Sequence, residues 1–210
     1  MVSSVETVSE FNPRDDEVDR RLRFYEKGET IPLVPGEVLQ VCQGVVQFSI
    51  LYPTGEEGLL GWAAPSACFS LNLTCLQTYR AMALSDVYLL WFSMTEIEAS
   101  PQLAQKLLPE LGTRLRQMEA LLAITGQRRV EDRLYQLLLL LKREFGEEVP
   151  GGTRLQLRLT HQEIANAICT TRVTITRLLG KLQQRGWIIR DQERYITLTP
   201  EAFVNIPSWF

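Results

Sequence analysis

The hydrophobic residues of the chain change their spacing twice between its two ends. From Arg23 to about Phe92, short runs of valine, leucine and aromatic residues alternate with turn sequences such as Val34-Pro35-Gly36-Glu37 and Tyr52-Pro53-Thr54-Gly55. Turn signals at this spacing are typical of a small β-sandwich or barrel. Residues 1–98 are therefore predicted to form one β-rich domain, in which residues 1–20 are a polar, acidic leader or a short helix.

Two segments of this region have a strand pattern. Val45–Leu51 and Leu59–Trp62 lie on either side of a turn at residues 53–58 and are predicted to form a hairpin. The stretch from Met82 to Trp91 is predicted to form one late, buried strand.

The spacing becomes helical after Thr95. The sequence predicts a helical segment from Thr95 past Pro101 to Leu108, and then a new helix with Pro109 in its first turn, where a missing N–H costs nothing. Residues at steps of three and four follow, namely Leu108, Leu111, Leu115, Met118, Leu122 and Thr125. Such an a/d seam indicates a helix that pairs with a copy of itself. The alternative is an amphipathic helix packed on its own sandwich, but roughly four to five turns are more than a small sandwich covers.

Gly126 and Gln127 break the seam and are predicted to be a hinge. Residues 99–126 are thus the predicted dimerisation segment, and residues 127–210 a second domain. This domain is expected to begin with a helix over Val130–Phe145, a loop over 146–152 and a strand over Thr153–Leu159.

The stretch Thr160–Ile188 has the pattern of two short helices joined by a tight turn. Thr160 and Glu163 form a capping box, which marks the start of the first helix. Cys169-Thr170-Thr171 interrupts the helical pattern, and either threonine can cap the second helix. That helix has an apolar, core-facing side made of Val173, Ile175, Leu178, Leu179 and Leu182 and a polar, cationic side made of Arg172, Thr174, Thr176, Arg177 and Lys181. This is the pattern of a helix-turn-helix, whose second helix lies in the DNA major groove.

After Gly186, the apolar runs Trp187–Ile189 and Tyr195–Leu198 flank a charged turn. They are predicted to form a hairpin, which makes the C-terminal domain a winged helix. The whole chain is therefore predicted to be of the α+β class.

The distribution of charge supports a polyanionic partner for the second domain. Between Pro150 and Tyr195 there are eight basic and three acidic residues, whereas residues 1–126 carry nine basic and sixteen acidic ones. A basic region on a helix-turn-helix favours binding to double-stranded DNA. The alternative is an ordinary helical hairpin with a solvated basic face.

Other function classes find little support in the composition. The four cysteines have no metal-ligand spacing, and His161 is the one histidine, so no metal site and no cofactor are expected. A cupin-type β-barrel enzyme needs several histidines around a metal, so we do not expect an enzyme. No apolar run approaches the ~20 residues that span a bilayer, and no signal peptide is visible, which predicts a cytoplasmic protein without membrane contact.

The order of sandwich, long helix, hinge and winged helix resembles the Crp/Fnr family of bacterial transcription regulators. The resemblance covers nearly the whole chain and is strongest in Leu159–Ala165 and Thr171–Leu179. Together with Arg133-Leu134 and Lys142–Gly146, these blocks are similar to the cyanobacterial nitrogen-control (NtcA-type) branch. The resemblance implies a cyclic-nucleotide-binding-like jelly roll at the N-terminus and a homodimer that acts on a palindromic site, with RNA polymerase as a partner.

The resemblance also assigns roles on the recognition helix. Arg172 and Arg177 match the base-contacting arginines, and a guanidinium fork can bond O6 and N7 of guanine. Val173 stands where many relatives have a glutamate, so the preferred half-site should differ from that of the catabolite regulators. The remaining residues at positions of phosphate or base contact are His161, Gln162, Thr170, Thr171, Thr174, Thr176 and Lys181. Relatives usually have a glycine at the position of Cys169, so a turn with positive φ would be mildly strained here.

The sensor half departs from the family pattern. Ser70 and Leu71 replace a glycine-glutamate pair, and Gln77-Thr78 replaces the arginine-serine pair that clamps a phosphate. A phosphodiester without its cationic partner loses charge-assisted hydrogen bonds, so binding of cyclic nucleotides is not expected. The candidate pocket residues are Phe69, Ser70, Leu71, Gln77, Thr78, Arg80 and Arg128.

Two modes of regulation stay open at this point. In the first, the pocket is degenerate, and activity depends on abundance or on a protein partner; the lost clamp residues favour this one. In the second, a small-molecule effector such as 2-oxoglutarate shifts the dimer toward a DNA-binding state. The expected function is an activator or related regulator in nitrogen or carbon control.

Overall fold

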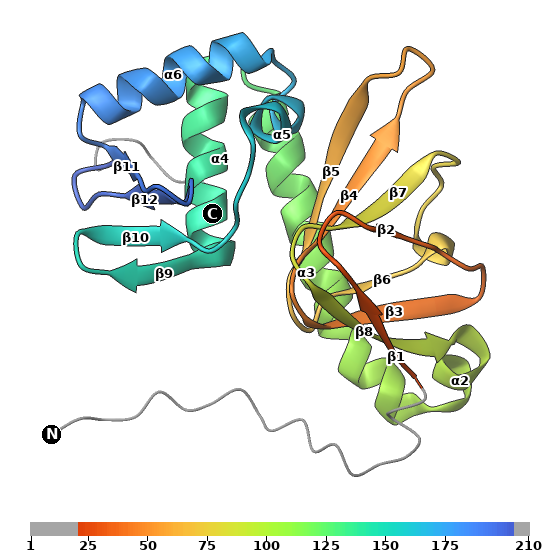
Figure 1. Cartoon of the computed structure of the whole chain (residues 1–210). Helices are drawn as coiled ribbons and strands as arrows, with labels where there is room; N and C mark the ends of the chain where they lie inside the picture. The colour runs from red at the N-terminus through yellow and green to blue at the C-terminus, as the bar shows by residue number, and fades with distance from the viewer. Residues whose placement is uncertain (1–20, 204–210) are drawn as a thin grey trace, which may run out of the picture.

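The computed structural model describes residues 21–203 and contains a β-sandwich, a long central helix and a C-terminal winged helix (Figure 1). The leader predicted over residues 1–20 lies outside the described residues. The α+β architecture expected from the sequence is confirmed.

The sandwich consists of two antiparallel four-stranded sheets. One sheet has the order β1 (Leu22–Tyr25), β8 (Val87–Ser93), β3 (Glu37–Gln43) and β6 (Cys68–Phe69). The other has the order β2 (Thr30–Ile31), β7 (Tyr79–Ala83), β4 (Val46–Leu51) and β5 (Glu57–Ala63). The predicted hairpin is β4–β5. Inward-facing apolar residues of both sheets, including Val41, Phe48 and Leu89, form the sandwich core.

The single strand predicted over Met82–Trp91 is wrong. The chain leaves β7 at Ala83 and enters β8 at Val87, because β7 pairs with β4 in one sheet whereas β8 pairs with β3 in the other. The connection holds a polar turn in which the backbone N–H of Val45 donates to Ser85 Oγ at 3.1 Å. A change of sheet is a tertiary event that a continuous apolar run does not reveal.

The predicted break at Pro109 is also wrong. After a short helix α2 (Met94–Ala99), the chain forms one continuous helix α3 (Pro101–Thr125), which Ser100 caps and Pro101 opens. Pro109 lies inside this helix, where it cannot donate to the carbonyl four residues earlier. Leu103 and Leu107 before the proline and Leu111 after it pack into one cluster with Val38 and Cys68. Packing on both sides of Pro109 thus keeps the helix continuous.

The C-terminal region contains α4 (Val130–Phe145), α5 (His161–Ala167) and α6 (Arg172–Gln184) around a four-stranded sheet. The sheet has the order β11 (Ile188–Arg190), β12 (Ile196–Leu198), β10 (Gly152–Leu155) and β9 (Gly146–Val149). The wing hairpin is thus present as β11–β12. The loop expected over 146–152 is instead mostly strand, and the strand expected over Thr153–Leu159 ends at Leu155, because β9 and β10 pair as a hairpin.

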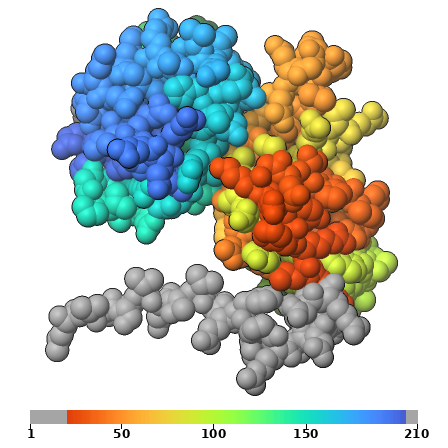
Figure 2. All heavy atoms as spheres, in the orientation of Figure 1, coloured from red at the N-terminus to blue at the C-terminus, as the bar shows by residue number. Residues whose placement is uncertain are grey.

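One hydrophobic core crosses the predicted domain boundary. Trp62 of β5, Ile124 of α3 and Leu138 of α4 belong to the same buried cluster, and the Trp62 and Phe145 rings meet edge to face at 6.3 Å. Figure 2 shows the C-terminal region abutting the sandwich along one side. The predicted DNA-binding domain is therefore packed against the predicted N-terminal β-rich domain.

Within residues 21–203, no helix is long and apolar enough to cross a membrane. The same residues contain no group of three or more histidine, cysteine or acidic side chains placed to hold a metal ion.

Candidate nucleic-acid interface and sensor cavity

The turn of the helix-turn-helix has the backbone expected for it. The capping box at Thr160 and Glu163 starts α5, and Thr171 caps α6 by accepting from the backbone N–H of Thr174 at 3.2 Å. Cys169 between them has a φ of +52°, the left-handed conformation that favours glycine. Arg133 of α4 donates from Nη1 to the carbonyl of Ile168 at 2.7 Å and to that of Cys169 at 3.3 Å. The guanidinium thereby binds both carbonyls of the strained turn.

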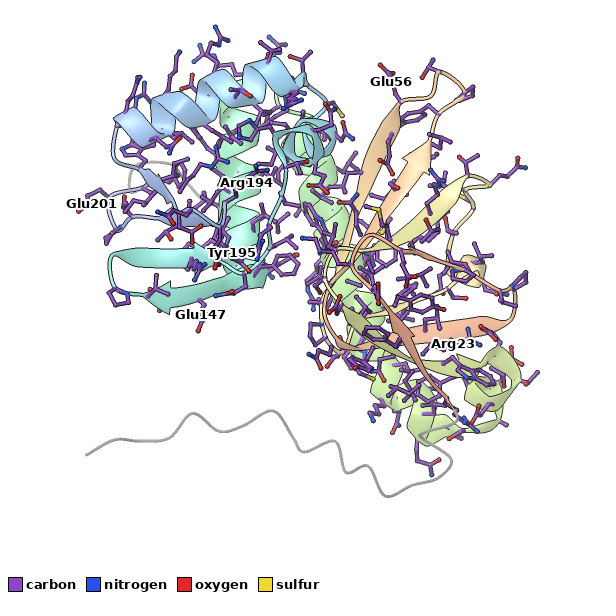
Figure 3. All side chains as sticks on the ribbon, viewed as in Figure 1. Arg23, Glu56, Glu147, Arg194, Tyr195 and Glu201 are labelled. Carbon is purple, nitrogen blue, oxygen red and sulfur yellow. The ribbon has the colours of Figure 1, made fainter. Side chains whose placement is uncertain are left out.

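Helix α6 buries its apolar side and exposes its cationic side. Ile175, Leu178, Leu179 and Leu182 belong to the core. Among the expected DNA contacts, Arg172, Val173, Thr176, Arg177 and Lys181 are all exposed. The core position predicted for Val173 is wrong: this side chain is 78% exposed, because it lies on the outer side of α6 between Arg172 and Thr174. Figure 3 shows α6 on the outer edge of the C-terminal region, with many of its side chains directed away from the rest of the domain.

The other residues that were predicted to contact DNA lie around α6, and most of them are half-buried or hydrogen-bonded within the protein. Thr171 Oγ1 lies 3.0 Å from Thr174 Oγ1, and Thr174 and Thr170 are half-buried. Gln162 is exposed on α5 and donates from Nε2 to Asn166 Oδ1 at 2.8 Å. His161 has hydrogen-bond partners on both ring nitrogens, Thr176 and Arg190. The structure thus brings all ten residues to one end of the C-terminal region, but with several side chains already bonded within the protein.

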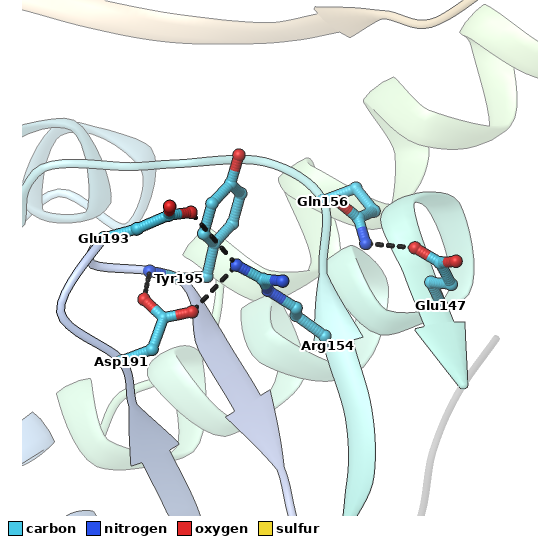
Figure 4. A network of polar contacts seen from close by, with 6 residues as sticks. All are labelled: Glu147, Arg154, Gln156, Asp191, Glu193 and Tyr195. Atoms are coloured by element: carbon cyan, nitrogen blue, oxygen red, sulfur yellow. Dashed lines mark hydrogen bonds and ion pairs between the residues drawn. The ribbon is translucent and has the colours of Figure 1, made fainter. Parts of the chain in front are cut away.

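The wing is held by a polar network that the linear sequence does not reveal (Figure 4). Arg154 of β10 donates from Nη2 to Asp191 at 2.8 Å and to Glu193 at 3.4 Å. Its guanidinium also stacks on the Tyr195 ring at 4.0 Å, and Arg158 stacks on the same ring at 4.7 Å. Arg154 thus offsets part of the negative charge of the two wing acids, next to the cationic Arg190 and Arg194.

A groove of about 920 Å³ runs between α5, the wing and the sandwich. Its cationic wall residues are Lys27, Arg158, Arg172, Arg190 and Arg194, against two acids, Glu163 and Glu193. The positive field of α6 therefore extends past the wing to the sandwich, which is the electrostatic footprint that a phosphate backbone requires.

A second cavity, of about 340 Å³, lies between the sandwich and α3. Its walls come from β5, β6, η1 (Leu71–Leu73), β7 and α3, and they include the predicted residues Phe69 and Ser70. Leu71, Gln77, Thr78, Arg80 and Arg128, which were also predicted, are not among the wall residues. Most of the lining is apolar, with polar groups from Cys68, Ser70, Thr74 and Tyr79 and the guanidinium of Arg114.

Arg114 is a cation in the cavity wall that was not among the predicted pocket residues. It donates from Nη1 to the Trp62 carbonyl and to Gln117 Oε1, both at 2.9 Å, and lies over the Phe48 ring at 4.3 Å. Burial lowers the pKa of Arg114 and raises the pKa of the neighbouring Tyr79 to about 12. The only sequence signal was its position in α3, one residue before the seam position Leu115.

The same cluster connects the cavity to α4. Gln117 Oε1 accepts from the backbone N–H of Trp62 at 2.9 Å, and Gln117 Nε2 donates to Glu144 Oε2 at 2.5 Å. Burial raises the pKa of Glu144. Gly61, with a φ of +130°, leaves room for this contact, since a Cβ there would lie 2.3 Å from Gln117 Oε1. Arg114, Gln117 and Glu144 thus form a polar bridge from the cavity beside α3 to α4.

Helix α3 presents two different faces. Leu107, Gln117, Ala120, Leu121 and Ile124 are buried against the rest of the chain. On the opposite face, four predicted seam residues are exposed: Leu108 (67%), Leu115 (57%), Met118 (51%) and Leu122 (74%). Leu111 and Thr125 are half-buried. Both interpretations of this helix therefore have a structural counterpart: one face packs on the chain itself, and the other is an unpartnered apolar stripe.

Comparison with known proteins identifies the C-terminal domain and finds relatives that span most of the chain. Residues 132–205 match the model of the Crp-like helix-turn-helix domain. The chain is 35% identical over 194 residues to the "Global nitrogen regulator" of Synechococcus elongatus, covering 87% of each chain. It is 33% identical over 175 residues to the "Regulatory protein CysR" of the same organism, covering 82% of this chain and 81% of that one.

Among solved structures, the fold is similar to a Crp-family transcriptional regulator of Thermus thermophilus. The TM-score is 0.72 at 20% identity, with 84% of this chain and 91% of that chain covered. The relatives are transcription regulators and not enzymes. The chain belongs to the Crp/Fnr family of transcription regulators and is similar to its nitrogen-control (NtcA-type) branch.

Proposed function

We propose that this regulator binds a two-fold-related DNA site as a homodimer, with one α6 helix in the major groove of each half-site. The observation that carries the proposal is the outer face of α6, where Arg172, Arg177 and Lys181 are exposed beside Val173. A cationic, solvent-facing helix of this kind is what a major-groove reader requires.

Within each half-site, Arg172 and Arg177 are proposed to read guanines through bidentate hydrogen bonds to O6 and N7. Val173 has no acceptor for cytosine N4, so it reads a base edge only by apolar contact. Thr171 and Thr174 hydrogen-bond each other, and they are proposed to contact phosphates at the helix start together with Gln162 and Thr170. Lys181 is proposed to contact a phosphate as a point charge.

The dimer is proposed to form through the exposed seam of α3. Leu108, Leu115, Met118 and Leu122 make a continuous apolar stripe with a/d spacing, which a second copy would cover in a coiled coil. In such a dimer, the two recognition helices should meet half-sites whose centres are about 34–36 Å apart, one turn of DNA.

Selection of binding sites from random DNA at stated salt tests this proposal directly. The expected product is a palindrome with a guanine in each half-site. Selection of a single, asymmetric half-site would contradict the dimeric arrangement, and recovery of no sequence preference would contradict base reading by α6.

The biological role is proposed to lie in nitrogen or carbon control, with RNA polymerase as the partner at target promoters. Support comes from the relatives named "Global nitrogen regulator". A change of target-gene expression with nitrogen source in a deletion strain is the expected result.

A small-molecule effector is the second candidate property, and the cavity beside α3 favours it. Its single cation, Arg114, lies in an apolar site where a carboxylate would gain charge-assisted hydrogen bonds. Cyclic nucleotides are not proposed, because Ser70, Leu71 and Gln77 lack the groups that hold the phosphate and ribose. A small carboxylate such as 2-oxoglutarate is the alternative that the cavity permits.

Calorimetric titration separates the two modes of regulation. If Arg114 binds a carboxylate, 2-oxoglutarate should bind the wild-type protein and bind Arg114→Gln at least about tenfold more weakly. Equal binding to both proteins would exclude Arg114, and no binding to the wild type would favour control by abundance or a protein partner.

A further inference from the structure

His161 occupies a junction between three parts of the DNA-binding region. It begins α5, and its Nδ1 lies 2.7 Å from Thr176 Oγ1 on the recognition helix α6. Its Nε2 lies 3.0 Å from Arg190 Nη1 on the wing strand β11. Both ring nitrogens are therefore engaged inside the protein, although the residue lies at the surface where DNA is proposed to bind.

The partners determine which nitrogen carries the proton. A guanidinium can only donate, so Nε2 accepts from Arg190 and Nδ1 must bear the hydrogen. Nδ1–H then donates to Thr176 Oγ1, whose own hydroxyl donates to the Arg172 carbonyl at 2.9 Å. This one-way chain from wing to recognition helix requires a neutral imidazole in a single tautomer.

The charges around the ring favour the same neutral state. Burial of the ring and the positive charges of Arg190, Arg172 and Arg194 lower the pKa of His161 below its ordinary value. Lys27 and Arg158 line the same groove, and its acids are Glu163 and Glu193. The Glu163 carboxylate is bonded to the backbone N–H of Thr160, as part of the capping box. At neutral pH the imidazole is uncharged and can accept from Arg190.

We propose that His161 is a positioning residue and not a DNA contact: as a neutral imidazole, it sets the orientation of Thr176 and Arg190 and joins the recognition helix to the wing. This inference rests on the proposed function, in which α6 reads DNA. It replaces the role in phosphate or base contact that the family resemblance implies for His161.

Protonation of His161 is expected to weaken DNA binding. Protonation places a hydrogen on Nε2, which then faces the Arg190 guanidinium with no acceptor between them. Since the bound state needs the neutral ring, DNA affinity should fall as the pH drops through the pKa of folded His161. A histidine in direct contact with phosphate predicts the opposite, because the DNA would favour the imidazolium.

The experiment measures operator affinity of the full chain at fixed salt, from about pH 8 to about pH 5, where histidine is the side chain that ordinarily titrates. His161 is the only histidine of the chain. Wild-type affinity should be constant near neutral pH and then fall roughly tenfold, as expected for the loss of one or two hydrogen bonds. The variant His161→Gln should lose this acid-side decrease, because its amide donates and accepts at any pH.

Two results would overturn the inference. An affinity that rises on acidification in the wild type, but not in His161→Gln, would make His161 a direct phosphate contact. Identical pH profiles for both proteins would show that the ring does not influence binding. The wild-type profile needs no variant, so it remains informative if His161→Gln folds poorly. Failure to bind any selected site at any pH would instead contradict the proposed function.

Discussion

The outer face of α6 and the cavity beside α3 are two candidate ligand sites built in opposite ways. The exposed residues of α6 that are predicted to contact DNA lie within Arg172–Lys181, on successive turns of one helix. The cavity wall combines residues from β5, β6, η1, β7 and α3, and its cation, Arg114, is half-buried. A site on one helix can be read from the linear order of residues, whereas a site made by convergence depends on the fold.

The largest expected effect concerns the seam of α3, which the proposed dimer needs and whose residue Leu115 also lines the cavity. Leu115→Glu combined with Leu122→Glu should place repelling carboxylates in the dimer interface. Operator affinity should then fall by roughly 100-fold or more, because a monomer binds a single half-site and loses the gain from two linked recognition helices. Sedimentation and operator titration measure the two losses together.

Ala123→Glu is the matched control, because Ala123 is exposed on the same helix but outside the seam. It should stay dimeric and bind DNA normally. A double variant that is monomeric but retains full operator affinity would disprove the need for a dimer.

The next effect separates base reading from phosphate contact on α6. Arg172→Ala should cost about 1–3 kcal/mol of binding free energy at one base position and relax specificity there. Lys181→Ala should instead weaken binding to all sequences and reduce the salt slope by about 1. Affinities for a set of single-base operator variants distinguish the two, and a uniform loss for Arg172→Ala would reassign Arg172 to a phosphate.

A smaller effect concerns the contact between Gly61 and Gln117 near the cavity. Gly61→Ala should lower the free energy of unfolding by about 1–3 kcal/mol, because the new Cβ meets Gln117 Oε1 and the positive φ is strained. Denaturant unfolding provides the measurement.

Gly55→Ala is the control for strain alone, since Gly55 also has a positive φ (+83°) but no atom within 4 Å of the added Cβ. If both variants lose the same stability, the contact between Gly61 and Gln117 has no energetic role.

The smallest effect concerns the turn before α6. Cys169→Gly should remove the backbone strain of a non-glycine residue in the left-handed conformation, but it also raises the entropy of the unfolded chain. The expected net result is a gain of roughly 0.5 kcal/mol in the free energy of unfolding. A loss of stability would indicate that the entropy cost of glycine in the unfolded chain exceeds the strain relieved at Cys169.

The parts predicted correctly from the sequence are those governed by local rules. The capping box at Thr160, the cap at Thr171 and the apolar side of α6 apart from Val173 follow from hydrogen bonding and helical period within a few residues. The β4–β5 hairpin follows in the same way from its turn residues. The position of Cys169 in a turn with positive φ was also expected, from the glycine usual in relatives.

The errors arose where distant contacts override local signals. Pro109 favours a helix start by itself, but Leu103, Leu107 and Leu111 pack into one cluster and carry the helix through it. Met82–Trp91 has the apolar content of one strand, but pairing with β4 and β3 divides it between two sheets. In both cases, the free energy gained by burying apolar side chains is larger than the local preference of the backbone for a helix start or for one continuous strand.

The sequence by itself determined the strand-rich pattern of the first half and the basic helix-turn-helix, because those features depend on residues close together in the chain. The regulator family followed from the resemblance that these blocks carry. The tertiary structure alone decided that Arg114 lines the sensor cavity, that Gln117 links it to Glu144, and that His161 joins Thr176 to Arg190. These contacts join residues from separate elements, and nothing in their sequence spacing specifies a hydrogen bond. They exist because burial of apolar residues brings β5, α3 and α4 together around Gln117, and α5, α6 and β11 together around His161.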